Sequence, residues 1–361
     1  MTRIGLVGLP QSGKTTIFEA LTGMEIDASA RRQASTASVS VPDQRHSILR
    51  DIFKPKKSVL SRIEFIDVPG VSTDDGPRKS EGSGSPGELL AALREADALV
   101  IVARAFQNPA VHHIHGGIDP LRDIEEVRTL LLLADLEVAE KRIEKLKVAV
   151  TKPTKLQDEN KKELALLERI QPFLESGEGL DAAEMDSAEE KKLRAFAFLT
   201  RKPILVVASI GDDQSQDAEE FKNLHAQCPD AIYIHGRLQR EISELDEADR
   251  KAFIEEMNLD GSVKEKLIRR CAELLRLQVF FTVGSDEVRA WQINAGDSAL
   301  IAAGKIHTDL QRGFIRAEVT SYEDFIECGS EREAKARNKM RLEGRDYVVQ
   351  DGDILAIRFS T

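Results

Sequence analysis

The stretch Gly8-Leu9-Pro10-Gln11-Ser12-Gly13-Lys14-Thr15 decides the fold of this chain, because it matches the pattern G-x-x-x-x-G-K-[ST]. The apolar residues 3–7 before it predict a short buried strand. Residues 16–22 after it predict a helix, and Gly23 is placed to end that helix. A strand, a glycine-rich loop and a helix start in this order form a P-loop, which binds phosphate. A turn that matches the pattern by chance is the alternative.

Each residue type in the loop has an expected role. The glycines let the backbone curl, so that successive N–H groups point at phosphate oxygens. Lys14 is expected to reach the β- and γ-phosphates, and the Thr15 hydroxyl to ligate Mg²⁺. The residues expected to bind nucleotide here are Gly8, Gln11, Ser12, Gly13, Lys14, Thr15 and Thr16.

The composition indicates a soluble globular protein with two or three domains. The chain has 361 residues, of which 41% are hydrophobic and 31% charged. Its net charge of −11 argues against general attraction to nucleic acid, so we expect no DNA partner. Three isolated cysteines predict reduced thiols. Because the sequence shows neither a signal peptide nor a membrane-spanning run, we expect a cytoplasmic protein without a membrane partner.

Apolar runs indicate an interrupted α/β domain. Residues 63–67 and 98–102 read as parallel strands buried on both faces, and the pattern returns at residues 202–208. In residues 121–196, between the second and third of these runs, apolar residues recur every three or four positions among many charges. This spacing predicts an inserted helical hairpin. Ordinary surface helices packed on the sheet are the alternative. From residue 278 onward short β-type runs dominate.

These patterns predict three domains. They are a nucleotide-binding domain of residues 1–120 and 197–277, a helical coiled-coil insertion of residues 121–196, and a carboxyl-terminal domain of residues 278–361.

A second motif, Asp67-Val68-Pro69-Gly70, follows a strand about fifty residues after the P-loop, as a P-loop hydrolase requires. Asp67 is expected to hold Mg²⁺ through water, and the Gly70 N–H to bond the γ-phosphate. An ordinary Asp-Pro-Gly turn is the alternative. Val71 comes next, where many regulatory GTPases carry a glutamine that orients water. An apolar side chain cannot do this, so hydrolysis here is slow or needs another group.

Two further segments leave alternatives open. The loop of residues 107–119 supplies His112, His113 and His115, which could act on water, hold a metal or lie in a solvated loop. Ser209-Ile210-Gly211-Asp212 follows a strand where GTP-specific proteins carry Asn-Lys-x-Asp. Since only the acidic end is kept, this segment does not decide between ATP and GTP.

With these residues located, the chain resembles the YchF-type Obg-like ATPases over essentially its full length. The P-loop and Asp67-x-Pro69-Gly70 match, and the most specific runs are carboxyl-terminal, at residues 287–291, 306–309, 313–317, 341–347 and 351–353. The resemblance implies a P-loop NTPase with a parallel sheet, an inserted helical hairpin and a carboxyl-terminal TGS domain, which is a β-grasp module. It also implies association with ribosomes.

The resemblance assigns further site residues. In that family the base-reading segment is Asn-x-x-Glu and the nucleotide is typically ATP. The matching positions here are Ser209 and Asp212, with Ile210 between them able to contact the base through its backbone. A loop histidine is catalytic in the family, and His113 aligns best with it. The family's first-switch motif is missing from residues 31–43, which leaves Ser35 or Thr36 as the Mg²⁺ ligand there.

The sequence therefore predicts a slow Mg²⁺-dependent nucleoside-triphosphate hydrolase that acts as a regulatory switch, with ATP slightly preferred over GTP and the ribosome as partner. A GTPase and a non-hydrolysing, nucleotide-dependent interaction module are the alternatives.

Overall fold

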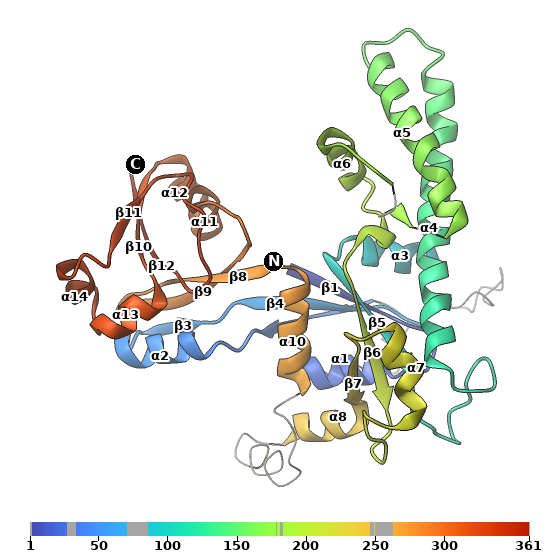
Figure 1. Cartoon of the computed structure of the whole chain (residues 1–361), viewed down its shortest axis with the longest axis horizontal. Helices are drawn as coiled ribbons and strands as arrows, with labels where there is room; N and C mark the ends of the chain where they lie inside the picture. The colour runs from blue at the N-terminus through green and yellow to red at the C-terminus, as the bar shows by residue number, and fades with distance from the viewer. Residues whose placement is uncertain are drawn as a thin grey trace. The chain divides into compact units, whose positions relative to one another are not determined.

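The computed structural model describes residues 2–26, 34–70, 86–177, 179–180, 183–245, 249 and 263–360, and these divide into two compact units (Figure 1). The large unit consists of residues 2–37 and 64–264, and the small unit of residues 38–63 and 265–361. Among the helices that lie in the described ranges, none is long and apolar enough to cross a membrane.

The large unit is built on a six-stranded sheet. Its strands, in spatial order, are β2 (Ser35–Ser40), β4 (Arg62–Asp67), β1 (Thr2–Val7), β5 (Ala98–Arg104), β6 (Ile204–Ile210) and β7 (Ile232–His235). The last four are parallel to one another, and every residue of β5 is buried. This is the fully apolar strand pattern of a parallel sheet covered on both faces. The boundary between the two units falls inside β2 and β4.

Helices and short 3₁₀ turns follow the strands of this sheet. They are α1 (Lys14–Thr22), α3 (Pro86–Arg94), α4 (Pro120–Ala149), α7 (Lys222–Gln227) and α8 (Gly236–Glu244), with η3 (Leu199–Arg201) and η4 (Glu219–Phe221). Gly23 ends α1 at φ 70°, in the left-handed region, as the sequence predicts. Asp119 caps α4 by accepting a hydrogen bond from the Arg122 N–H, with Pro120 at the first helical position.

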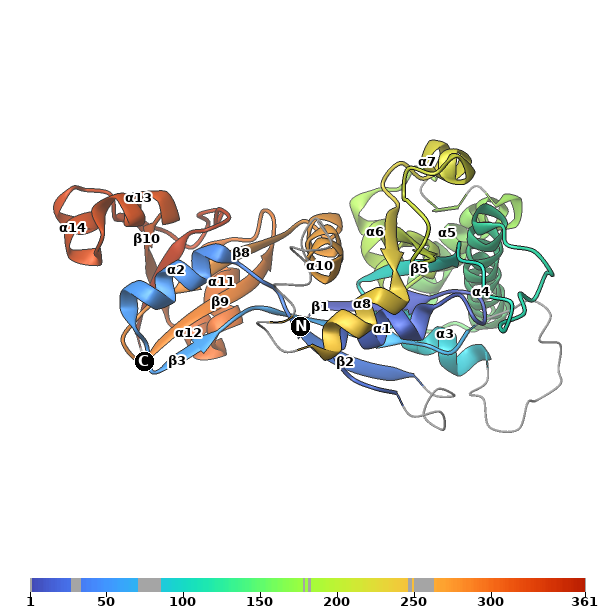
Figure 2. The ribbon, with the colours of Figure 1, turned by 90° about the horizontal axis from the view of Figure 1, so that it is seen from below.

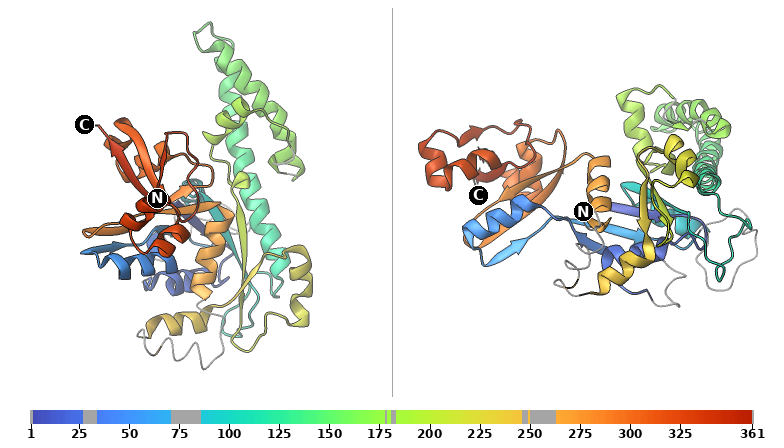
Figure 3. Two further views of the ribbon diagram at one scale, coloured as in Figure 1. Left: turned by 60° about the vertical axis from the view of Figure 1, so that its left-hand side comes forward. Right: turned by 60° about the horizontal axis from the view of Figure 1, so that its bottom comes forward.

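The helix α4 has two different neighbourhoods along its length. Its first turns, with Ile124, Val127 and Leu131, belong to the core of the sheet. Its later turns pack against α5 (Gln157–Ser176) and α6 (Ser187–Arg194) in a separate apolar cluster. Figure 3 shows α4 and α5 side by side. The sequence offers an inserted hairpin and helices packed on the sheet as alternatives. The first turns of α4 pack on the sheet, and its later turns pair with α5, so each alternative describes one part of this helix.

The small unit contains a second six-stranded sheet. Its strands, in spatial order, are β11 (Arg341–Glu343), β10 (Phe314–Thr320), β12 (Ile354–Phe359), β8 (Leu277–Thr282), β9 (Glu287–Asn294) and β3 (Lys57–Val59). The strands β8 and β9 form an antiparallel hairpin, and β12 runs parallel to β8. With α11 (Ala299–Ile306) between β9 and β10, this is the β-grasp arrangement that the sequence predicts.

Helices cover both faces of the small unit's sheet. On one face, α11 contributes Ala299, Ala302 and Ala303 to the core. The other face is covered by α2 (Gln44–Phe53) and α13 (Tyr322–Cys328). The remaining helices of this part of the chain are α10 (Val263–Leu274), α12 (Thr308–Arg312) and α14 (Glu331–Ala336).

Residues 38–63 belong to a different unit than the predicted boundaries imply, since those boundaries put all of residues 1–120 in the nucleotide-binding domain. In the structure α2 and β3 belong to the small unit, where β3 pairs with β9 (Figure 2). The physical reason is the apolar face of α2. Leu49 is fully buried against the small unit's sheet, and Phe53 stacks on Phe325 with ring centroids 5.5 Å apart. Arg45 adds an ion pair of 2.7 Å to Asp351.

Candidate functional site

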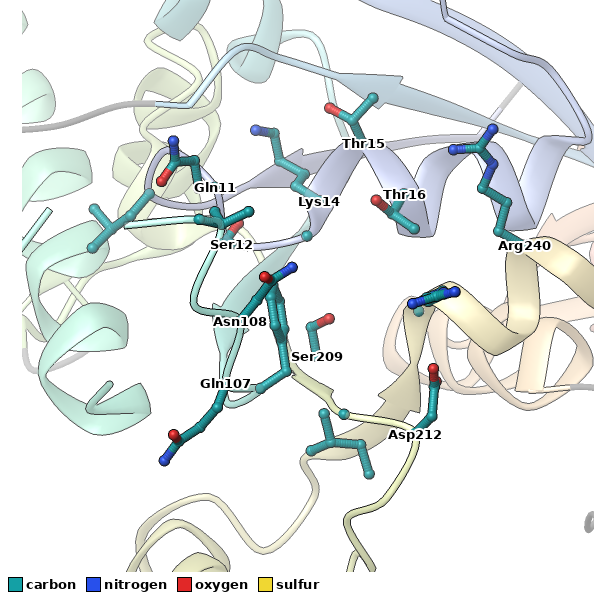
Figure 4. Close-up of a pocket in the computed structure, with 18 of the residues that line it drawn as sticks. Gln11, Ser12, Lys14, Thr15, Thr16, Gln107, Asn108, Ser209, Asp212 and Arg240 are labelled. Carbon is teal, nitrogen blue, oxygen red and sulfur yellow. The ribbon is translucent and has the colours of Figure 1, made fainter. Parts of the chain in front are cut away.

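A pocket of about 990 Å³ lies within the large unit, where its parallel strands end. The P-loop lines one side, and the carboxyl end of β6 with the start of α8 lines another. Figure 4 shows Lys14, Thr15 and Thr16 on α1 facing the pocket, with Ser209 and Asp212 across from them. Ligands of open α/β sheets bind at this edge, outside the carboxyl ends of the strands.

The P-loop is shaped to bind an anion. Gln11 and Gly13 have φ values of 63° and 90°, so the backbone bends through the left-handed region immediately before α1. The first N–H groups of a helix have no acceptor within the helix, and here they border the pocket. The Ser12 hydroxyl is buried, and no described residue bonds to it. Gly8 lies below the loop, against the Val102 carbonyl of β5. These groups fit a phosphate.

Lys14 and Asp67 form a buried pair of opposite charges beside the loop. The Lys14 Nζ is 3.9 Å from Asp67 Oδ1, and their side chains are only 5% and 7% exposed. Burial lowers the pKa of Lys14, and the charge of Asp67 opposes that shift. An anionic ligand would favour the charged form of this lysine. Lys14 is therefore suited to neutralise phosphate charge.

The predicted Mg²⁺ ligands are only partly brought together. The Thr15 hydroxyl donates a hydrogen bond of 2.9 Å to Asp67 Oδ2, so two oxygen ligands of the kind that Mg²⁺ prefers are adjacent. Thr36 is exposed on β2 and does not line the pocket, and Ser35 lies on the same strand. The structure thus supports Thr15 and Asp67 as a site for the ion and does not bring Thr36 to them.

Gly70 lies directly against the P-loop. A Cβ atom at this position would be 2.6 Å from the Cα and 2.7 Å from the N of Pro10, so only glycine fits without a shift of the backbone. This contact places the Gly70 backbone at the rim of the pocket. The prediction for Val71 lies outside the described residues, as do residues 72–85 of the second switch and residues 31–33 of the first.

The predicted base-reading segment forms the far end of the pocket. Ser209 is buried at the end of β6, and a Cβ at Gly13 would be 2.7 Å from its hydroxyl. Ile210 and Asp212 line the pocket with it. The turn is held at Gly211, whose N–H donates to the Gln214 side chain at 2.6 Å and whose carbonyl is 2.8 Å from the His235 ring. The segment is therefore a fixed turn.

The helix α8 supplies pocket residues along its whole length, and they are not among the residues predicted from the sequence. Arg237, Arg240, Glu241 and Glu244 all line the pocket. Arg240 is 3.3 Å from Glu244 and 3.5 Å from Glu19 of α1, so it joins the two helices. A signal existed, because four charged residues at spacings of three and four mark one face of a helix that starts directly after a strand.

The loop after β5 lines the pocket with Phe106, Gln107, Asn108 and Val111, but His113 does not line it. The His113 side chain is 5% exposed, with Nε2 2.8 Å from the Asp123 carboxylate. Its Nδ1 accepts a hydrogen bond of 3.2 Å from the His115 N–H. Both ring nitrogens are thus engaged away from the pocket.

The neighbouring histidines do not reach the pocket either. His115 Nε2 is 2.6 Å from the Glu126 carboxylate, and His112 is exposed on the loop. The described residues contain no group of three or more His, Cys, Asp or Glu side chains that could hold a metal ion. The histidine metal site considered from the sequence therefore has no support in this loop.

Comparison with known proteins gives matches along the whole chain. The family model described as a 50S ribosome-binding GTPase matches residues 3–162. The model for the carboxyl-terminal part of YchF GTPases, itself described as a protein of unknown function, matches residues 277–360. The chain is 37% identical to the "Ribosome-binding ATPase YchF" of Haemophilus influenzae and 36% identical to that of Bacillus subtilis. Each alignment covers 99% of this chain, and 99% and 98% of the relatives.

A solved structure also matches along almost the whole chain. The YchF GTPase of Schizosaccharomyces pombe is similar with a TM-score of 0.81 and 26% identity, covering 99% of this chain and 97% of that one.

Proposed function

We propose, since the chain belongs to the YchF family, that it binds and hydrolyses a nucleoside triphosphate in association with the ribosome. The observation that carries this proposal is the pocket itself, where the start of α1, buried Lys14 and the Thr15–Asp67 pair lie together. Relatives named ribosome-binding ATPases support the partner. A cytoplasmic location follows from that partner.

The residues at the phosphate end of the pocket have different proposed roles. The N–H groups of the P-loop and Lys14 would bind the β- and γ-phosphates and neutralise their charge. Thr15 and Asp67 would hold Mg²⁺, which supplies charge stabilisation at the phosphoryl group when bound. The Gly70 N–H would bond the γ-phosphate, so its position reports whether that phosphate is present.

We give ATP a slight preference over GTP because the family's nucleotide is typically ATP and its relatives are named ATPases. Ser209, Ile210 and Asp212 line this end of the pocket. By resemblance, Ser209 and Asp212 match the positions at which the family carries Asn and Glu, and Ile210 would contact the base through its backbone. The acidic side chain of Asp212 accepts hydrogen bonds, which both the adenine amino group and the guanine N–H groups donate. GTP is therefore the alternative substrate.

We propose His113 as the catalytic residue that orients water. The residue after Gly70 is apolar and cannot do this. To act, His113 must leave the Asp123 carboxylate, because its Nε2 is bonded to Asp123 of α4 and its Nδ1 accepts from the His115 N–H. A residue that has to exchange partners before each turnover fits a slow switch. The same bonding favours a second candidate function, a non-hydrolysing module in which bound nucleotide fixes the conformation.

The carboxyl-terminal β-grasp sheet is proposed to be the TGS domain of the family. The paired helices α4 and α5 are proposed to be its coiled-coil insertion. Both are candidates for contact with the ribosome.

Two measurements test this function. Titration of the full chain with ATP and with GTP, each with Mg²⁺, is expected to give a Kd for ATP that is lower by a small factor. Release of phosphate is expected to be slow and to rise when ribosomes are added. Binding without phosphate release, with and without ribosomes, would favour the non-hydrolysing module. No binding of either nucleotide would refute the proposal.

A further inference from the structure

We propose that Arg104 is a positioning residue that holds one wall of the pocket in its ligand-binding shape. This wall, the loop wall, is formed by Phe106, Gln107, Asn108 and Val111. The proposal rests on the proposed function, because it concerns the nucleotide that this pocket takes. It adds a residue that does not line the pocket and that acts through the loop.

Arg104 is the last residue of β5 and is 2% exposed, so the sheet fixes its position. Its guanidinium donates to carbonyls of the loop wall. Nε donates to the Phe106 carbonyl at 3.2 Å, and one terminal nitrogen donates to the carbonyls of Val111 at 2.9 Å and Asn108 at 3.4 Å. One buried side chain therefore binds the start, the middle and the end of the loop wall.

The same guanidinium also lies over an aromatic ring of the wall. Its central carbon is 4.6 Å from the centroid of the Phe106 ring, a cation–π arrangement. The planar guanidinium of arginine can stack on a ring while its N–H groups bind carbonyls, and the ammonium group of lysine cannot do both. The loop wall has little regular secondary structure to support it, apart from a turn in which the Val111 N–H donates to the Asn108 carbonyl at 3.1 Å.

The charge of Asp123, the carboxylate that binds His113, also acts on Arg104. Burial lowers the pKa of Arg104, and the negative charge of Asp123 opposes that shift. Asp123 is 2% exposed and is bonded to both Arg122 and His113. The other terminal nitrogen of Arg104 is buried and has no hydrogen-bond partner among the described residues. The loop is thus anchored to buried charges along its length.

The expected effect is confined to one end of the ligand. The P-loop is continuous with β1 and α1 and lies against Gly70, and it meets the loop wall at the Phe106 ring, which would be 3.4 Å from a Cβ at Gly13. The loop wall lies across from α8 and beside Ser209, where the nucleoside would bind. Loss of Arg104 should therefore weaken binding of the nucleoside part and leave binding of the triphosphate part unchanged.

The test compares two ligands on the full chain, ATP and inorganic tripolyphosphate, each with Mg²⁺. Arg104→Ala is expected to raise the Kd for ATP at least tenfold, because charge-assisted hydrogen bonds are lost. The Kd for tripolyphosphate should stay within about twofold of the wild-type value. Arg104→Lys should give an intermediate Kd for ATP, because lysine keeps the charge but not the planar fork.

Arg94→Ala is the matched control. Arg94 is also mostly buried and donates to two carbonyls, those of Ala134 at 3.0 Å and Ala197 at 3.1 Å, but it does not line or touch the pocket. Its loss should lower the Tm and leave the ratio of the two Kd values unchanged. If Arg104→Ala does not fold, the same comparison is made with Arg104→Lys.

Two results would overturn the proposal. One is an equal loss of affinity for ATP and tripolyphosphate in the Arg104 variants, and the other is no change for either ligand. Wild-type protein that binds neither ligand would refute the proposed function, and this proposal with it. Wild-type protein that binds ATP while the variants fail the comparison would refute the role of Arg104 alone.

Discussion

Gly70→Ala tests whether the second motif and the P-loop form one closely packed site. A Cβ at residue 70 would lie 2.6 Å from the Cα of Pro10 and 2.7 Å from its N. Ordinary van der Waals contact begins at about 3.4 Å, so the backbones must separate by roughly 0.8 Å (3.4 − 2.6). Both close atoms are backbone atoms, and rotation of a side chain cannot relieve the contact.

The size of this shift sets the expected losses. Misplacement of catalytic groups by about 1 Å can cost on the order of 100-fold in rate. We therefore expect kcat/KM for phosphate release to fall by between about 10- and 100-fold. Overpacking of this kind costs about 1–3 kcal/mol of the free energy of unfolding.

The assay measures phosphate release over a range of concentrations of the nucleotide that wild-type protein hydrolyses faster, with urea unfolding in parallel. Gly344→Ala is the control, because a Cβ there meets nothing within 4 Å and its φ is not in the left-handed region. The control should match wild type in both measurements. A Gly70→Ala protein with kcat/KM within twofold of the control would refute the close packing on which the site is built.

Three further predictions concern the catalytic loop, the effect of pH and the small unit. His113→Ala should lower kcat at least tenfold, the lower range of a general acid–base effect, with a Kd for nucleotide within about threefold; unchanged turnover in a phosphate-release assay would remove His113 from catalysis. Burial raises the pKa of Cys271 to about 12, so the stability that its neutral thiol contributes is complete below about pH 9 and is lost as pH rises toward 12. Between pH 8 and pH 10.5 wild-type protein should therefore lose more unfolding free energy in urea than Cys271→Ala, and equal losses would contradict this. Residues 265–361 expressed alone should lack a cooperative thermal transition, because α2 and β3 complete their sheet; a cooperative transition, followed by circular dichroism, would show that the fold does not need them.

The phosphate end of the site could be predicted from the sequence because its geometry is local. Residues 8–16 are consecutive, and a strand followed by a helix fixes their positions. The partner Asp67 was predictable from its own motif at the end of a strand. Its 2.9 Å contact with Thr15 follows from the neighbouring positions of β1 and β4 in the sheet. The alternation of strands and helices likewise gave the parallel sheet.

The remaining features depend on contacts between distant segments. Nothing near Arg45 in the sequence shows that its partner is Asp351, 306 positions away. The predicted nucleotide-binding domain therefore includes residues 38–63, which the structure groups with the small unit. The charged face of α8 could be read as a helix face, but not as part of a pocket. The bond between His113 and Asp123, in contrast, could have been predicted from the sequence. Asp119-Pro120 predicts the start of a helix, so Asp123 in its first turn was a foreseeable partner.

The central claim is that this pocket hydrolyses a nucleoside triphosphate with Lys14 on its phosphates. Phosphate release from ATP and from GTP by wild-type protein and by Lys14→Ala, each with and without Mg²⁺, tests it most directly. We expect wild-type protein to release phosphate only when Mg²⁺ is present. Lys14→Ala, which loses the buried positive charge, should be at least 100-fold slower, about 2.7 kcal/mol or more in the barrier. Equal rates for the two proteins would contradict the claim.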